Sequence, residues 1–210
     1  MSRLFGVGAL AALALACPAR GEPVTADVLL GLEAFGEVRI DPRVLKDTSG
    51  SEFSEPRPLP PATALDEASE YFDNWQEDAS RRQELAEFAL SRGFNSEAAF
   101  ELHRVAETLY QGLLLVLTLY SPKSHNLIRL RNMTEPLEPR LRAVWPHETK
   151  FQKRCFELLR AAYVKARYSR HYRITEEELA WLTERIELLR QIVREACEAR
   201  LAELRRAAGA

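Results

Sequence analysis

Apolar residues recur at three- and four-residue steps from about residue 64 to the C terminus, and this spacing predicts helices with one buried face. The first predicted helix begins at Thr63 or Asp66 and ends at Gly93, and its outer face is mostly acidic. Its predicted inward residues are Leu65, Ala68, Tyr71, Phe72, Trp75, Ala79, Leu85, Phe88 and Ala89.

A second helix is predicted from Asn95 or Ser96 to a stop at Ser121-Pro122. Its second half is apolar nearly all round, which indicates a central position in the fold. A short helix over 125–131 follows it and is closed by two prolines.

Two further long helices complete the pattern. The first begins near Glu148, and the second begins with the capping box Thr175 to Glu178. Four long helices and one short helix predict an all-α fold, an antiparallel bundle over 63–208, because this arrangement buries the apolar stripes against one another.

The N-terminal part has a different character. Residues 1–20 resemble a secretory signal, since Arg3 precedes an apolar run that ends in the cleavage-like triplet Ala14-Leu15-Ala16; a wrongly assigned start is the alternative. The run is too short to cross a bilayer. Residues 21–62 contain many chain-breaking prolines and are interpreted as an irregular linker or as the remnant of an upstream domain.

Composition describes an ordinary globular chain. It is 46% hydrophobic and 29% charged with a net charge of -2, which argues against wholesale coating of nucleic acid or anionic membrane. The three cysteines, Cys17, Cys155 and Cys197, are an odd number, and the last two fall within helical patterns, so we expect reduced core thiols. Neither a zinc-type spacing nor an HExxH motif is present, and we expect no metal or other cofactor.

Three segments in order carry a resemblance to a known family: FELHRVAETLYQGLLLVLTLY (100–120), SPKSHNLIRLR (121–131) and FELLRAAYVKARYSRHYRITEEEL (156–179). Together they resemble HEPN domains, over roughly 64–204. The closest resemblance is to the HEPN half of proteins that carry a nucleotidyltransferase domain upstream. Gly50-Ser51 matches the start of that domain's motif, but no carboxylate pair for magnesium follows, so the transferase half is absent from this sequence.

The resemblance implies nucleotide or nucleic-acid handling. In many members it implies a metal-independent ribonuclease, usually a dimer, in which four to six residues separate an arginine from the histidine that follows it. The matching residue here is Arg167. His171 follows with only three residues between them, and the four-residue spacing reaches Tyr172 instead. Arg167, His171 and Tyr172 are therefore the catalytic candidates, while the departure in spacing favours binding over cleavage.

Two other polar pairs allow more than one interpretation. Arg142 and His147 have four residues between them, but they lie in the connection between prolines and are interpreted as solvated loop residues. His103 and Glu107 lie one helical turn apart on the central helix. They form either a polar pair in the site or a hydrogen-bonded pair that bridges two helices.

Charge distribution supports a binding surface without reference to any family. Residues 140–173 contain ten Lys or Arg and two Glu, whereas 64–107 contain eleven Asp or Glu and four Arg. The basic strip, with tyrosines interleaved, could follow a phosphate backbone and stack a base; alternatively it pairs with the acidic first helix, within the bundle or across a dimer. The predicted phosphate or nucleic-acid ligands are Lys123, His125, Tyr163, Arg167 and Arg170.

The sequence thus favours a module that binds nucleotide or RNA, as a homodimer in the cytoplasm, and the resemblance implies a separate nucleotidyltransferase as partner. A ribonuclease of toxin type is the alternative. A third hypothesis, an exported helical interaction protein, depends on the signal-like residues 1–20.

Overall fold

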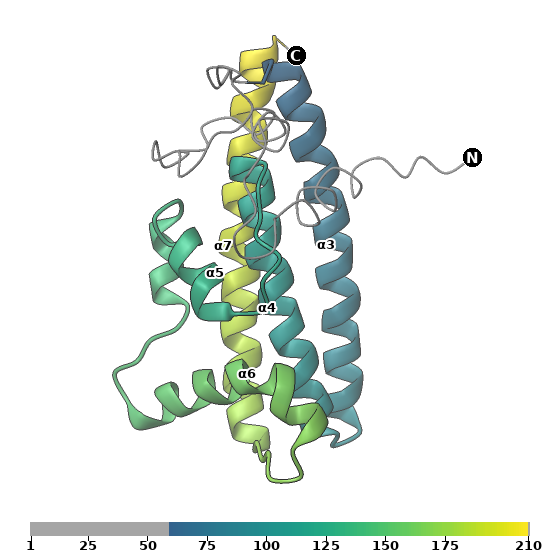
Figure 1. Ribbon diagram of the computed structural model, residues 1–210, viewed down its shortest axis with the longest axis vertical. Coiled ribbons are helices and arrows are strands. Elements are labelled where there is room, and N and C mark those ends of the chain that lie inside the picture. The colour runs from purple at the N-terminus through teal and green to yellow at the C-terminus, as the bar shows by residue number, and fades with distance from the viewer. Residues whose placement is uncertain (1–58, 210) are drawn as a thin grey trace, which may run out of the picture. The chain divides into compact units, whose positions relative to one another are not determined.

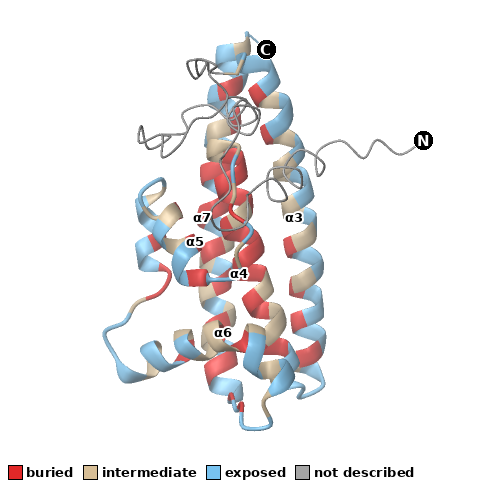
Figure 2. Ribbon diagram, viewed as in Figure 1, coloured by how far each residue is buried: buried red, intermediate tan, exposed pale blue. Residues whose placement is uncertain are grey.

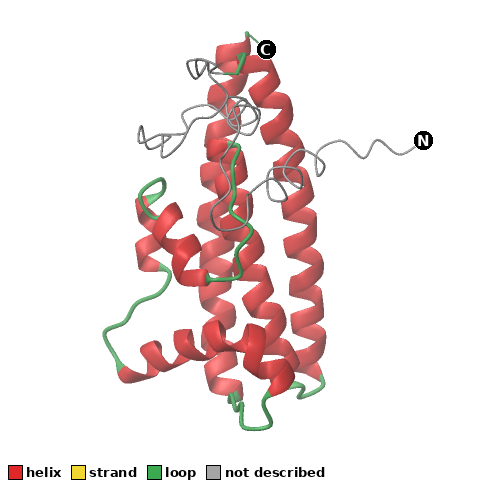
Figure 3. Cartoon of the chain, viewed as in Figure 1, coloured by secondary structure: helices red, strands yellow, loops and turns green. Residues whose placement is uncertain are grey.

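The computed structural model describes residues 59–209, which contain helices and loops and no strand (Figure 3). The all-α prediction is confirmed, with four long helices and one short one. The elements in order are α3 (Pro61–Ser91), α4 (Asn95–Thr118), α5 (Leu127–Thr134), the 3-10 helix η2 (Pro139–Ala143), α6 (Lys150–Tyr168) and α7 (Glu176–Ala208). The signal-like segment 1–20 and nearly all of the predicted linker 21–62 lie outside the described residues.

Side-chain caps fix where three helices begin. Thr175 accepts from the backbone N–H of Glu178, and the Glu178 carboxylate accepts from the N–H of Thr175, so the predicted capping box opens α7. A second capping box, Thr149 with Gln152, opens α6. Asn126 caps α5 by accepting from two backbone N–H groups, which places His125 immediately before the helix.

The central helix is α4, as its apolar second half predicts. It packs against α3, α5, α6 and α7. Figure 1 shows α3, α4 and α7 side by side along the long axis, with α6 crossing their lower half. Buried positions concentrate along α4 and α7 (Figure 2). The crossing matters for function because it brings the middle of α6 against the first half of α4.

One part of the predicted core is wrong. Leu85 and Phe88 on α3 were expected to face inward, but they are 54% and 59% exposed. Gln83 and Ala86 are buried in their place, while Ala79 is buried as predicted. A stripe of small residues lets α3 pack closely on its neighbours, and a rule that follows the largest apolar side chains selects the wrong face.

Cys155 and Cys197 are buried free thiols, as expected. Burial raises the pKa of Cys155 to about 11 and that of Cys197 to about 12, so both remain protonated at neutral pH. No helix within 59–209 is both long enough and apolar enough to cross a membrane.

Candidate functional site

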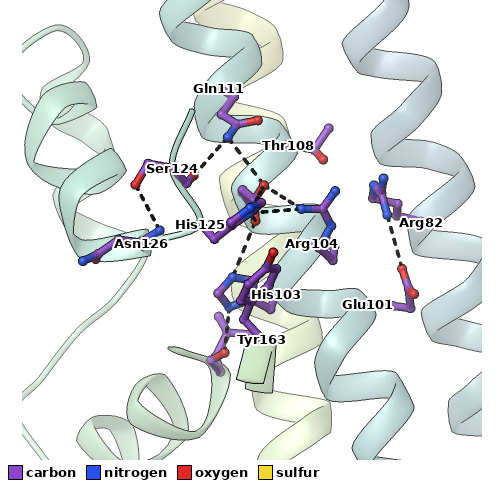
Figure 4. A network of polar contacts seen from close by, with 12 residues as sticks. Arg82, Glu101, His103, Arg104, Thr108, Gln111, Ser124, His125, Asn126 and Tyr163 are labelled. Atoms are coloured by element: carbon purple, nitrogen blue, oxygen red, sulfur yellow. Dashed lines mark hydrogen bonds and ion pairs between the residues drawn. The ribbon is translucent and has the colours of Figure 1, made fainter. Parts of the chain in front are cut away.

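A buried carboxylate in the middle of α4 organises the polar centre of the molecule. Glu107 is 3% exposed, and its oxygens accept hydrogen bonds from Arg104 Nη1 at 2.7 Å and from His125 Nδ1 at 3.0 Å (Figure 4). Gln111, one turn further along α4, donates to the backbone oxygen of Ser124 at 3.1 Å. That bond ties the loop before α5 to α4 and thereby holds His125 over Glu107.

The surroundings of Glu107 keep it ionised. Burial alone would raise the pKa of its carboxyl, but the nearby imidazole of His103, the hydrogen bond from His125 and the positive charge of Arg104 together lower the pKa below its ordinary value. A carboxylate only accepts hydrogen bonds, so Nδ1 of His125 carries the proton that points to Glu107. When the imidazole is neutral, its other nitrogen, Nε2, therefore holds a lone pair.

His103 links the same carboxylate to α6. It is 1% exposed, and its Nδ1 donates to the backbone oxygen of Leu159 at 2.9 Å. Its Nε2 lies 3.7 Å from Glu107 Oε2 and has no hydrogen-bond partner among the described residues. The structure therefore brings the predicted pair His103 and Glu107 together and adds His125 to it. The bond from His103 to Leu159 also bridges α4 and α6.

The ring of Tyr163 on α6 covers this cluster. It stacks on His125 with ring centroids 4.2 Å apart and an angle of 17° between the planes, and it lies 5.3 Å from the ring of His103. The stack and the hydrogen bond to Glu107 restrain the imidazole of His125 in two directions. The side chain of His125 remains 52% exposed, so the restrained ring still meets solvent.

Arg167 is a fixed cation at the end of α6. Its Nε and Nη2 donate to the backbone oxygen of Tyr163, one turn earlier, at 3.0 and 2.8 Å. Its Cζ lies 4.8 to 5.0 Å from the centroids of three rings, those of Phe100, Tyr163 and Tyr168. Arg167 itself is exposed, and Tyr168 is 76% exposed. The guanidinium is thus held in one orientation and open to a ligand.

The residues after α6 separate into exposed and buried positions. The helix ends at Tyr168, and Arg170 and His171 are exposed in the turn that follows. No hydrogen bond or ion pair within 59–209 joins His171 to Arg167. Tyr172 is 5% exposed and its hydroxyl donates to the backbone oxygen of Leu158 at 3.0 Å, and burial raises the pKa of this hydroxyl. Tyr172 therefore packs in the core, with its only proton already engaged.

An open groove of about 410 Å³ lies between the start of α5 and the C-terminal half of α6. His125 and Tyr163 line it, and so does Arg160, which forms an ion pair with Glu157. Lys123 is exposed in the loop that leads to His125. The groove therefore opens beside the rings of His125 and Tyr163, and the ion pair of Arg160 with Glu157 lies on its wall.

The basic strip does not neutralise the acidic face of α3. Within the described residues, Arg140 pairs with Glu138 and Glu195, and Arg154 pairs with Glu178. Ion pairs of the α3 carboxylates go to arginines of α3 itself. The proposed pairing inside the bundle is thus not observed, and Arg167, Arg170 and Lys165 remain outside any ion pair in 59–209.

Sequence reasoning missed three contributors to this site: Arg104, Phe100 and Arg160. Arg104 had a readable signal, because it precedes Glu107 by three residues and therefore shares its helix face. Phe100 and Arg160 had none, since their roles depend on how α6 crosses α4. Residues 59–209 contain no group of three or more His, Cys, Asp or Glu side chains arranged to hold a metal ion.

Comparison with known proteins identifies one family. The family model of the HEPN domain matches residues 72–196, which span α3 to α7 and include every residue of the cluster. No curated protein matches the chain significantly. The family match covers more than half of the sequence, and the chain therefore belongs to the HEPN domain family.

Proposed function

We propose that this HEPN domain binds RNA, or a nucleotide with the same phosphate and base chemistry, at the edge formed by His125, Tyr163, Arg167 and Tyr168. The observation that carries the proposal is the guanidinium of Arg167, which is held by two hydrogen bonds and three aromatic rings and yet is exposed. A planar cation of fixed orientation suits a phosphate. The exposed ring of Tyr168 offers a stacking surface for a base, as in other proteins that bind single strands.

The basic residues around this edge extend the surface along a strand. Lys123 lies in the loop before α5, and Lys165 and Arg170 flank the end of α6; all three are exposed. Contacts to phosphate release counterions, so affinity should fall with salt. Stacking alone is far less sensitive to salt, and the salt dependence of binding therefore measures how many of these cations take part.

A binding assay tests the proposal. The fluorescence anisotropy of a labelled single-stranded RNA is titrated with wild type, Arg167→Ala, Arg167→Lys and Arg205→Ala. Arg205 is the matched control, an exposed arginine in the last turn of α7 whose removal changes the net charge equally. We expect Arg167→Ala to weaken binding by about tenfold or more, since hydrogen bonds to a charged group are worth about 1.5–3 kcal/mol. The affinity of Arg167→Lys should lie between those of wild type and Arg167→Ala, and Arg205→Ala should bind like wild type.

Two results would contradict the proposal: absence of RNA and nucleotide binding by wild type, or equal weakening by Arg167→Ala and Arg205→Ala. Equal weakening would mean that only net charge matters. Competition by ATP separates a mononucleotide site from a strand-binding surface. A mononucleotide site would be blocked by ATP at concentrations that leave a longer strand-binding surface occupied.

The proposal extends to partners and to location. A homodimer is supported by the opposite charges of α3 and of 140–173, and by the exposed Leu85 and Phe88 on α3. A separate nucleotidyltransferase is proposed as a second partner on the resemblance alone. RNA binding fits a cytoplasmic protein. Mass spectrometry of the mature N terminus tests this, since cleavage after Ala16 would favour the exported alternative.

A metal-independent ribonuclease is the second candidate function. Tyr172 has its hydroxyl engaged in the core, and no hydrogen bond or ion pair within 59–209 joins His171 to Arg167. The observation that favours cleavage lies elsewhere, in the bond between His125 and Glu107.

A further inference from the structure

We propose that the groove between α5 and α6 is a guanine-binding site, in which the carboxylate of Glu157 and the guanidinium of Arg160 bind the edge of the base. The inference rests on the proposed function, since the base belongs to an RNA strand held at the Arg167 edge. A free guanine nucleotide has the same chemistry, and competition experiments separate the two sources. Binding of this kind is reversible and breaks no bond in the strand.

The groove offers a stacking surface for one planar base. Tyr163 covers one face of the His125 ring, and Glu107 holds its Nδ1 edge (Figure 4). The His125 side chain is nevertheless 52% exposed and lines the groove, so its remaining face is the part that meets solvent. Ala161 and Val164 add apolar surface. The volume of about 410 Å³ lies in the range of small-molecule sites, about 300–1,000 Å³, and aromatic and apolar surfaces suit the face of a base.

The polar wall of the groove places an acceptor and a donor side by side. Glu157 and Arg160 both line the groove, and Nη1 of Arg160 donates to Oε1 of Glu157. This bond uses only part of the capacity of either group, because a carboxylate has sites for about four hydrogen bonds and a guanidinium has five N–H donors. Neither side chain has another hydrogen-bond partner within 59–209. The pair therefore holds both groups in position and leaves them able to bind a ligand.

Guanine has the edge that fits this wall best. Its N1–H and its 2-amino group are adjacent donors, which the two oxygens of one carboxylate accept together, and its O6 accepts from a guanidinium. On the same edge, adenine, cytosine and uracil each have a single donor group. None of these three bases therefore donates to both oxygens of Glu157, and the carboxylate distinguishes guanine from them.

The groove lies on the same face of α6 as the proposed binding edge. Arg160 and Arg167 are seven residues apart and Val164 and Tyr168 are four apart, and helix residues at these spacings share a face. A rise of about 1.5 Å per residue places Arg167 about 10 Å along the helix axis from Arg160. Tyr163 lines the groove, and its ring centroid lies 4.9 Å from Cζ of Arg167. A strand bound at the Arg167 edge thus has a nearby nucleotide within reach of the groove.

The experiment measures the fluorescence anisotropy of labelled oligouridine strands that carry guanosine, inosine, adenosine or uridine at one central position. Inosine keeps the N1–H and O6 of guanosine but lacks its 2-amino group. The proteins are wild type, Glu157→Gln, Arg160→Ala and the control Glu203→Gln. Glu203 is the matched control because it pairs with Arg200 three residues earlier on α7, and its side chain is 58% exposed against 64% for Glu157. Circular dichroism checks that each variant folds.

We expect wild type to bind the guanosine strand about tenfold more tightly than the adenosine or uridine strand, with the inosine strand between them. Glu157→Gln should lose most of the difference between guanosine and inosine, since an amide has one accepting oxygen in place of two. Removal of a negative charge also raises the affinity for every strand, so the ratio between strands is the readout. Arg160→Ala should reduce the ratio between inosine and adenosine, because O6 loses its donor. Glu203→Gln should keep the wild-type ratios.

Competition with GMP and AMP identifies the source of the base. We expect both to displace the guanosine strand weakly and equally, because a mononucleotide makes few of the contacts of a strand. Displacement by GMP at concentrations where AMP has no effect would overturn the assignment to a strand and assign the groove to a free guanine nucleotide.

The outcomes separate this inference from the proposed function. Wild type that binds all four strands with equal affinity overturns the guanine site and leaves the binding function intact. A ratio of guanosine to inosine that is unchanged in Glu157→Gln, or reduced equally in Glu203→Gln, also overturns the guanine site. Wild type that binds neither the strands nor the two nucleotides overturns both proposals.

Discussion

Two buried polar clusters lie one helical turn apart on α4 and differ in charge and in access to solvent. The cluster around Tyr110 is neutral and closed: the tyrosine hydroxyl accepts from Trp145 Nε1 at 2.8 Å, and both residues are at most 1% exposed. The cluster around Glu107 is charged and opens to solvent through His125. A satisfied neutral pair inside a core adds stability, whereas a buried charge costs desolvation that its partners only offset. The difference makes the first a structural pair and the second the candidate site.

The closed cluster should dominate stability. Trp145→Ala removes a side chain that packs against Phe156 and Trp181, with ring centroids 5.0 and 6.4 Å away. We expect the free energy of unfolding to fall by about 3–5 kcal/mol, the usual loss for a buried tryptophan. Urea denaturation of wild type and Trp145→Ala measures this loss. The matched control is Phe88→Ala, an aromatic that is 59% exposed, which should change stability by at most about 0.5 kcal/mol. Equal losses in the two variants would show that Trp145 is not a core anchor.

A smaller change tests the hydrogen bond of that cluster alone. Tyr110→Phe keeps the ring but leaves the indole N–H of Trp145 without its acceptor. A buried donor left unpaired costs about 1–3 kcal/mol, which denaturation of wild type and variant should reveal. RNA binding at temperatures where both proteins are folded should be unchanged. A variant as stable as wild type but weaker in binding would contradict the separation of the two clusters.

Features that local sequence encodes were predicted, and features that depend on tertiary packing were not. Helix number, order and the centrality of α4 follow from periodicity and capping, which are local. Leu85 and Phe88 were misplaced because α3 packs through small residues, a preference set by its neighbours. Trp145 has no periodic context, since it follows the 3-10 helix η2 in a connection.

The site was predicted in parts. The sequence predicts the pair of His103 and Glu107 from their spacing of one helical turn, and it predicts Arg167 from the family motif. His125 joins this pair only because the loop before α5 folds back to α4. Arg167 stacks on Phe100 only because α6 crosses α4. Both are tertiary contacts between segments far apart in sequence, and no local pattern encodes them.

The smallest expected effect is a dependence on pH that distinguishes two carboxylates of α4. The pKa of Glu107 is lowered, so the folded state binds its proton less readily than the unfolded chain, and the stability from Glu107 is present above the ordinary value of 4.5 and lost as the pH falls below it. Glu107→Gln removes this contribution. The difference in unfolding free energy between wild type and Glu107→Gln should therefore shrink as the solution is acidified, as urea titrations at several pH values would measure.

Glu101 supplies the opposite sign on the same helix. Burial raises its pKa above 4.5 even though Arg82 and Arg104 act against the rise, so the folded state binds its proton more readily than the unfolded chain. The free energy of unfolding of wild type should then fall relative to that of Glu101→Gln as the pH increases through 4.5 and above. Opposite slopes for the two variants would show that only Glu107 is held as a carboxylate by its partners. Slopes of the same sign would mean that Glu107 has no special stabilisation of its charge, and the distinction between a structural and a charged cluster on α4 would then fail.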